Sequence, residues 1–440
     1  LYAGMKYCFT GIYVYAPELQ TDLYHAVLNF GNFQGAFYSY SVLANEGACN
    51  NAWFGLYNYI ANANFLIEGT RKLLDRGTLS EADAALVRRY YGEACYIRAH
   101  MYYLLVQFFC EDYEPATAGD VYGVPVVTVY APTPDASKYP SRGSLAKTYA
   151  QIVADLTEAE TYVTAPGQPN SIFVTADVVA ALQARVALSM HDYSTAFNKA
   201  KGLIDSGRYP LESDRTAYAE AWLRDNLCET LWQPVMTGPD DTGNSFPYFI
   251  NNATGREGED NPQYVPEDWA LKLYDKTNDI RYDAYFSERE LRMPVTGRLT
   301  LLVKYPGNPQ LYTQTTNYVN QPKVFRISEM YLIAAEAAAN RQGQESIASY
   351  YLNELKSKRI AGWYERDYSG QALVKEIRDE RVRELFGEGQ RLFDLKRWHI
   401  GFQRSAGQNP ALMQPGANYV SCMRPADDPF FLWPIPTDEV

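Results

Sequence analysis

The run R-D-E-R-V-R-E-L-F-G-E-G-Q-R-L-F-D-L-K-R-W at residues 378–398 decides how this chain folds. Its apolar residues recur at helical spacing on both sides of Gly387 and Gly389, so we expect two helices that meet at a glycine corner. The charged residues between them carry both signs at a density that a lone helix does not need, which predicts ion pairs between facing helices. The charged set, extended upstream, is Arg326, Glu329, Glu336, Arg378, Glu380, Arg381, Glu384, Arg391, Asp394 and Arg397.

The same run resembles the C-terminal signature of the SusD/RagB outer-membrane nutrient-binding lipoproteins, E-R-x-x-E-L-x-x-E-G-x-R-x-x-D-L-x-R-W. The match extends without a gap from Glu380 to Trp398. Two further runs are similar to family motifs, R-I-S-E-M-Y-L-I-A-A-E-A at 326–337 and W-P-I-P at 433–436. The resemblance covers nearly everything from Trp53 onward and is weakest in two loop regions.

The resemblance implies a non-catalytic binding protein that is lipid-anchored to the extracellular face of an outer membrane. Such proteins capture oligosaccharide fragments, or in some members peptides, and deliver them to a SusC-like TonB-dependent transporter. The resemblance therefore implies two partners, the ligand and the transporter, and neither a cofactor, a metal ion nor a catalytic residue. The membrane would be reached only through an N-terminal lipid anchor that this sequence does not contain.

Composition excludes other partners. The 440 residues are 47% hydrophobic and 21% charged, as in globular proteins, and no run of eighteen apolar residues predicts a membrane span. Lys and Arg number 40 and Asp and Glu 52, so the net charge is −12. Phosphate groups would on average be repelled, so we expect no nucleic acid partner.

The six cysteines show no C-x-x-C pair and no metal-ligand spacing, so we interpret them as buried or incidental thiols. The chain begins with Leu1 and without a signal-peptide pattern, which is typical of a mature or trimmed protein. Cys8 follows Gly-Met-Lys-Tyr and lacks the small and apolar residues of a lipidation site. We therefore expect the lipidated cysteine to lie elsewhere.

Paired helices recur along the chain, and they predict a mostly α fold of tetratricopeptide-like helix pairs forming a right-handed scaffold. Residues 175–207 form the clearest unit, with a cap at Thr175, a turn at His191-Asp192 and a closing glycine at 207. Similar pairs are expected from Trp53 to Phe109 and from Arg326 to Ile360. We also expect a helix from Asp268 to Arg281 and a short strand from Leu299 to Tyr305, among the scaffold's short β elements.

We expect a single domain, residues 1–440, with the scaffold at about 46–230 and 266–400. Two segments at about 20–47 and 234–265 are rich in glycine, asparagine and aromatic residues and lack helical periodicity, so they are expected to form the ligand-side loops. The chain has 37 tyrosines, and flat amphipathic rings suit both sugar faces and wet interfaces. For any single ring, packing onto the helices is the alternative interpretation.

The candidate ligand-binding residues come from these two segments. Aromatic rings would stack on sugars while amides and a guanidinium bind the hydroxyls. Each ~100 Å² of apolar surface buried would contribute roughly 2.5 kcal/mol, so two or three contacts predict a capture site of modest affinity. The candidates are Tyr24, Asn29, Phe30, Asn32, Phe33, Phe37, Tyr38, Tyr40, Asn45, Phe246, Tyr248, Arg256 and Tyr264, with Gln34 as a further polar partner.

Two other functional classes stay open. A helical glycosidase would need a carboxylic acid that keeps its proton, but nearby arginines are expected to hold these acids ionised. The four histidines, His25, His100, His191 and His399, are dispersed and match no catalytic motif, and we expect His100 to lie in the core. The acidic runs at 240–241 and 257–260 lack the spacing of a calcium loop. A scaffold that binds only proteins is the third class.

Overall fold

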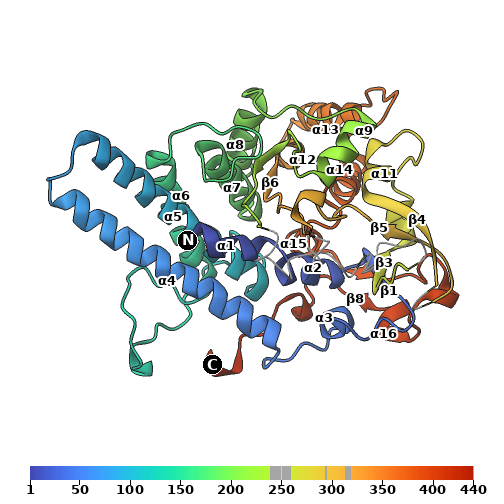
Figure 1. Cartoon of the computed structure of the whole chain (residues 1–440), viewed down its shortest axis with the longest axis horizontal. Helices are drawn as coiled ribbons and strands as arrows, with labels where there is room; N and C mark the ends of the chain where they lie inside the picture. Colours follow the sequence, from blue (N-terminus) through green and yellow to red (C-terminus); the bar gives the residue numbers. More distant parts are fainter. Residues whose placement is uncertain (238–248, 250–258, 293–294, 313–318, 440) are drawn as a thin grey trace.

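The computed structural model describes residues 1–237, 249, 259–292, 295–312 and 319–439. Helices dominate, and most of the short strands lie at one end, whereas β6 lies beside α7 and α12 (Figure 1). In chain order the elements are α1 Tyr2–Met5, α2 Ile12–Leu19, β1 Tyr24–Ala26, α3 Gly35–Ser39, α4 Gly47–Asp75, α5 Glu81–Phe109, α6 Leu145–Tyr162, α7 Ala176–Ser189, α8 Tyr193–Asp205, α9 Arg215–Leu223, β2 Thr230–Trp232, β3 Tyr264–Pro266, α10 Asp268–Leu271, α11 Ile280–Tyr285, β4 Phe286–Leu291, β5 Gly297–Leu302, β6 Phe325–Arg326, α12 Ile327–Ala339, α13 Glu345–Arg359, α14 Gly370–Leu385, α15 Arg391–Arg397, β7 Phe402–Gln403, α16 Ala417–Val420 and β8 Met423–Arg424.

Stacked helix pairs form the scaffold, which confirms the predicted fold class of tetratricopeptide-like pairs. The long pair α4 and α5 packs along α6, and α7 and α8 pack against each other and against α12 (Figure 1). Helix α12 in turn packs on α13 and α14. Each helix buries its apolar face on the next, so one hydrophobic core runs from Met5 to Trp433.

Side-chain caps begin several of these helices, including the predicted cap at Thr175. Ser80, Ser144 and Thr175 each accept a hydrogen bond from a backbone N–H of the first turn of α5, α6 and α7. Trp53 is 3% exposed and packs edge-on against Phe109, as expected for a core residue. Within the described residues, no helix combines the length and the hydrophobicity that crossing a bilayer requires.

The strands form two-stranded antiparallel ladders, of which β4–β5 is the longest. Strand β5 confirms the expected strand at 299–305, although it begins at Gly297 and ends at Leu302. The expected helix from Asp268 to Arg281 is wrong. It stops at Leu271 because the Asp275 carboxylate accepts hydrogen bonds from the backbone N–H groups of Thr277 and Asn278 and stabilises a turn.

The glycine corner between α14 and α15 is confirmed. Gly387 and Gly389 have φ angles of 74° and 76°, in the left-handed region that glycine adopts without a steric penalty. A Cβ atom at Gly389 would lie 3.1 Å from the Cα atom of Val14, so the corner also needs glycine to let α2 approach. The carboxylate of Glu18 on α2 accepts hydrogen bonds from the N–H groups of Gly389 and Gln390.

Buried ion pairs join helices that are distant in sequence, as the charge pattern predicts. The Glu384 carboxylate contacts the guanidinium groups of Arg281, Arg326 and Arg359 at 2.9, 2.7 and 3.0 Å. Further buried or largely buried contacts in the same region include Arg359–Glu229, Arg281–Glu380, Arg381–Asp394, Arg397–Glu336 and Arg185–Glu329 between elements, and Arg383–Glu380 and Arg397–Asp394 within one helix each. Pairs of this kind fix which helices can face one another.

Three smaller expectations are also settled. Among the described residues Arg378 has no carboxylate partner and instead stacks over the Trp398 ring at 5.0 Å, so its predicted ion pair is wrong. His100 is 1% exposed, which confirms it as a core residue. The six cysteines are free thiols, and only Cys228 is not fully buried.

Glu18 gives the first prediction. It is 1% exposed, its Oε2 atom has no hydrogen-bond partner, and burial raises the pKa of its carboxyl to about 8. A raised folded-state pKa means that its contribution is fully present below the unfolded pKa of about 4.3 and is lost as pH rises towards 8. We expect Glu18→Gln to leave the thermal midpoint unchanged at pH 4 and to raise it by a few degrees at pH 8. An equal change at both pH values would contradict this reasoning.

Candidate ligand-binding face

A segment between α2 and α4 carries most of the candidate residues, and strand β1 fastens it to the scaffold. Tyr24–Ala26 pairs with Tyr264–Pro266 of β3, which brings the two predicted ligand-side segments together. The backbone continues this pairing, because Val27 forms a bridge with Met413 and Leu28 N–H donates to the Leu412 carbonyl. The two segments therefore form one structural unit with the chain near residue 412.

The buried residue Arg404 holds this unit together, although no sequence motif indicates its role. Its side chain is 2% exposed and lies 3.6 Å from the centre of the Tyr38 ring. The guanidinium donates hydrogen bonds to the carbonyl groups of Leu19, Thr21 and Tyr38 and, at 3.3 Å, to that of Asn418. One buried cation thus connects the end of α2 and the residues that follow it, α3, and the C-terminal region near Asn418.

Burial changes the interpretation of the candidate aromatic residues. Tyr24, Phe37, Tyr38 and Tyr264 have exposed fractions of 0%, and Phe30 and Tyr40 are buried as well. The rings of Phe30 and Tyr38 contact those of Tyr264 and Tyr419, with the Tyr38 and Tyr419 rings stacked at 5.6 Å. The other three rings pack on the scaffold and the C-terminal region: Tyr24 on Phe386, Phe37 on Trp433 and Tyr40 on Phe402. Burying these rings against the helices removes more apolar surface from water than leaving them to meet a ligand. We therefore correct their expected role: these six rings pack the segment and do not present a stacking face.

The exposed part of the unit is a turn at residues 28–34, which we name the amide turn. Four of its residues, Asn29, Gly31, Asn32 and Gln34, have φ angles between 50° and 69°. Non-glycine residues in this region are strained, and such strain concentrates at functional sites. The side chains of Asn29 and Asn32 are exposed and, across the described part of the chain, have no hydrogen-bond partner. Both are free to bind a hydroxyl.

The other candidates fall into three groups. Phe33 is partly buried next to the amide turn, and its backbone carbonyl accepts a hydrogen bond from the Tyr264 hydroxyl. Asn45 is exposed on the turn before α4. The remaining candidates, Phe246, Tyr248 and Arg256, lie outside the described residues. Their ligand contacts stay predictions.

The acids of the ion network do not offer general-acid chemistry. Although burial alone would raise it, Arg281 and Arg383 lower the pKa of the Glu380 carboxyl to about 2. Burial also opposes ionisation of Glu384 and Asp394, yet their arginine partners hold the pKa of each carboxyl below its usual range. Acids in this state are ionised at neutral pH and have no proton to donate.

One arrangement resembles a catalytic triad only in composition. His25 Nδ1 lies 2.9 Å from a Glu267 oxygen, and the Ser405 hydroxyl donates to the other oxygen of the same carboxylate. The serine therefore contacts the acid, whereas a triad needs the serine to contact the histidine. His25 and Glu267 are also completely buried. This cluster stabilises the β1–β3 connection.

Comparison with known proteins shows which family this chain resembles. The SusD family model matches residues 243–440, and a second family model, described as "Starch-binding associating with outer membrane", matches residues 18–188. A curated relative, SusD-like protein P2 of Formosa agariphila, is 26% identical over 399 residues, which are 81% of this chain and 73% of the relative.

Solved structures share the fold over the whole chain. A SusD superfamily protein from Bacteroides thetaiotaomicron superposes with a TM-score of 0.83 at 23% identity, covering 100% of this chain and 95% of that one. A putative sugar binding protein from Bacteroides vulgatus gives 0.80 at 22% identity and covers 100% and 93%. With two family models on separate parts of the sequence and a relative spanning most of it, the chain resembles the SusD/RagB family over most of its length.

Proposed function

We propose that this protein is a non-catalytic cell-surface carrier that binds oligosaccharides through the amide turn. The observation that carries the proposal is the pair of exposed side-chain amides of Asn29 and Asn32, which have no hydrogen-bond partner among the described residues. The backbone of both residues is in the left-handed conformation, and the buried aromatic rings of the same segment pack beneath them. Amide groups can both donate to and accept from sugar hydroxyls, and a backbone that is already ordered lowers the cost of binding. The starch-binding description of one matching family model and the sugar-binding name of one structural relative support the same ligand class.

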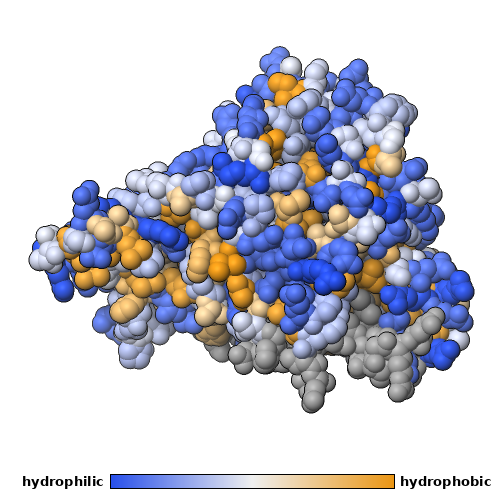
Figure 2. Space-filling model, turned by 45° about the horizontal axis from the view of Figure 1, so that its top comes forward, coloured by the Kyte–Doolittle hydropathy of each residue, from blue (hydrophilic) through white to orange (hydrophobic). Residues whose placement is uncertain are grey.

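We further propose that the carrier is lipid-anchored to the outer leaflet of the outer membrane and passes its ligand to a TonB-dependent transporter. The family model's description of outer-membrane association supports this placement. A band of hydrophobic side chains also follows the α4–α5 pair (Figure 2). Its exposed members are Phe54, Phe65, Leu66, Leu73, Leu86 and Tyr90. Exposed apolar surface of this kind supports a protein partner.

The ligand proposal is tested by titration calorimetry with malto-oligosaccharides, β-glucan oligosaccharides and mixed peptides. We expect heat from a glycan and a Kd between micromolar and millimolar. The double variant Asn29→Ala/Asn32→Ala removes two hydrogen bonds of about 1 kcal/mol each, so the affinity should fall by about tenfold or more. Asn226→Ala, which removes an exposed amide after α9, is the matched control and should bind as the parent does.

Four results would contradict the proposal. Heat from peptides alone would identify a peptide carrier, and heat from neither class would leave a protein-binding scaffold. Release of reducing sugar, lost on mutation of two carboxylates, would establish an enzyme. Equal affinity of the double variant and the control would show that the glycan binds away from the amide turn.

A further inference from the structure

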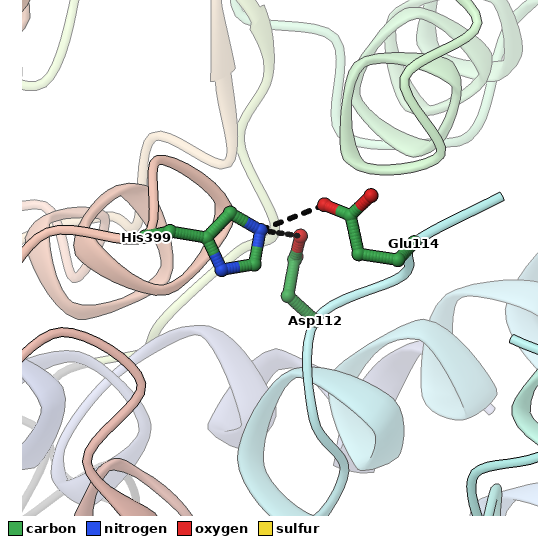
Figure 3. Close-up of side chains that lie close together, drawn as sticks. All are labelled: Asp112, Glu114 and His399. Carbon is green, nitrogen blue, oxygen red and sulfur yellow. Dashed lines mark hydrogen bonds and ion pairs between the residues drawn. The ribbon is translucent and has the colours of Figure 1, made fainter. Parts of the chain in front are cut away.

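Two histidines meet two carboxylates at a place where the sequence predicts no site. Asp112 and Glu114 lie on the loop after α5, and His399 lies just after α15. The fold brings these residues, which are far apart in the sequence, next to one another (Figure 3). His399 Nε2 lies 2.7 Å from Glu114 Oε1 and 3.9 Å from Asp112 Oδ2. One nitrogen and one oxygen from each acid lie within 4.8 Å of one another.

His191, from the turn between α7 and α8, lies against the same two acids. Its Nε2 atom is 3.5 Å from Asp112 Oδ2, and its Nδ1 atom is 3.6 Å from Glu114 Oε1. The cluster therefore offers two imidazoles and two carboxylates from three separate parts of the chain. Four donors of these types suit a closed tetrahedral site.

His399 is oriented as metal-binding histidines are. Its Nδ1 atom lies 2.6 Å from the Asp427 carboxylate, which directs Nε2 towards Asp112 and Glu114. A carboxylate behind a histidine in this way fixes the ring and raises its basicity as a ligand. His191 and His399 also have φ angles of 58° and 51°, strained for residues with a side chain, so their backbone positions are imposed by the surrounding fold.

An unsatisfied oxygen points to a missing ligand. Asp112 is 11% exposed, and its Oδ2 atom is buried without a hydrogen-bond donor. The neighbouring cation, Lys396, donates instead to the backbone carbonyls of Gln107 and Cys110 at 2.7 Å each. Arg397 also acts on Asp112 but is already paired with Glu336 and Asp394. With neutral imidazoles, the carboxylates of Asp112, Glu114 and Asp427 therefore keep an excess of negative charge that a divalent cation would offset.

We propose that Asp112, Glu114, His191 and His399 bind a divalent transition-metal ion, for which Zn²⁺ is the best match to the donor set. Ligand bonds of about 2.0–2.2 Å in a tetrahedron place donor atoms roughly 3.3–3.6 Å apart. His399 Nε2 and one oxygen each of Asp112 and Glu114 already lie within 4.8 Å of one another. His191 would supply the fourth donor through one of its nitrogens, either Nε2 at 3.5 Å from Asp112 Oδ2 or Nδ1 at 3.6 Å from Glu114 Oε1, once its side chain rotates towards the other three. The ion would cross-link the loop after α5, the α7–α8 turn and the end of α15.

Without metal the same residues can only form charge-assisted hydrogen bonds. Hydrogen bonds to Asp427 and Glu114 outweigh the effect of burial and raise the pKa of the His399 imidazole, which describes the metal-free form. In that case added zinc would change nothing, and the two possibilities are separated by direct measurement of metal binding.

The test uses the full chain prepared without a polyhistidine tag, stripped with a chelator and dialysed. We expect it to take up one equivalent of Zn²⁺ in competition with a chromophoric chelator, to melt at a higher temperature with zinc, and to give the intense visible spectrum of tetrahedral Co²⁺. His399→Ala should bind at least 100-fold more weakly and lose the zinc-dependent rise. Asp427→Asn, which changes only the residue behind His399, should bind 10- to 100-fold more weakly.

Glu111→Gln is the matched control, since it removes an exposed negative charge next to the cluster but no ligand atom. It should bind zinc as tightly as the parent, and circular dichroism of the metal-free variants confirms that they fold. Zinc uptake by the parent that is no tighter than uptake by His399→Ala would overturn the proposal. An octahedral Co²⁺ spectrum would overturn it as well.

Discussion

Glu384→Gln is expected to lower the free energy of unfolding by about 3–5 kcal/mol. The carboxylate is completely buried and contacts Arg281, Arg326 and Arg359 within 3.0 Å. Glutamine keeps the shape but removes the charge, which leaves three buried guanidinium groups with too little negative charge around them. Breaking a buried ion pair from one side typically has an effect of this size, because the remaining charge stays out of water.

Urea denaturation followed by tryptophan fluorescence measures the change. Glu220→Gln is the matched control, because it breaks the exposed pair with Arg224 on the surface of α9 and should alter stability by less than about 1 kcal/mol. A Glu384→Gln variant as stable as this control would show that the network does not hold the helices together.

The pH dependence of the same variant has a definite sign. Its arginine partners hold the pKa of Glu384 well below its usual range, despite the opposing effect of burial. A lowered folded-state pKa means that the stabilisation is present above the unfolded pKa of about 4.3 and is lost as pH falls through the folded value. We therefore expect the difference between parent and variant to be full at pH 7 and to shrink below about pH 4.

The glycine corner shows which parts of the fold could be predicted from sequence. Helical spacing on both sides of Gly387 and Gly389 is local information, and the structure confirms both helices. Ion pairing was also predictable as a property of the region, since charges of both signs cannot be buried unpaired. The actual partners were not, because Arg281 and Arg359 reach Glu384 from elements about 100 and 25 residues away. Only the stacking of the helices determines those pairs.

The binding face was predicted less well for a related reason. A glycine-rich segment with aromatic residues looks the same in sequence whether its rings pack the loop or bind a ligand. In the structure six of the candidate rings are buried. Their packing depends on Arg404, which donates its hydrogen bonds to backbone carbonyl groups. Because every residue has a carbonyl group, such contacts cannot be recognised from a sequence pattern. The histidines at 191 and 399 are likewise dispersed in sequence, and a cluster that forms only between α5, α7 and α15 has no spacing to detect.

Arg404→Met is expected to destabilise the binding face by about 3–5 kcal/mol. Methionine matches the length of arginine but donates no hydrogen bond, so the carbonyl groups of Leu19, Thr21 and Tyr38 lose their buried donor. Each unsatisfied buried acceptor costs about 1–3 kcal/mol, and local opening to water recovers part of that. The effect should stay local, because the four carbonyl groups that accept hydrogen bonds from Arg404 lie outside the stacked helices from α6 to α14.

Hydrogen exchange read by mass spectrometry distinguishes this outcome from global destabilisation. Exchange should rise in residues 19–40 and around Asn418, while α7 and α8 stay protected as in the parent. Arg298→Met, which removes an arginine that is 70% exposed, should leave both regions unchanged. If the amide turn binds the glycan, Arg404→Met should also weaken binding although it touches no ligand, because the buried rings that hold the backbone at Asn29 and Asn32 in place lose their packing. Glycan affinity equal to the parent's, together with increased exchange in the turn, would show that the ligand does not depend on this face.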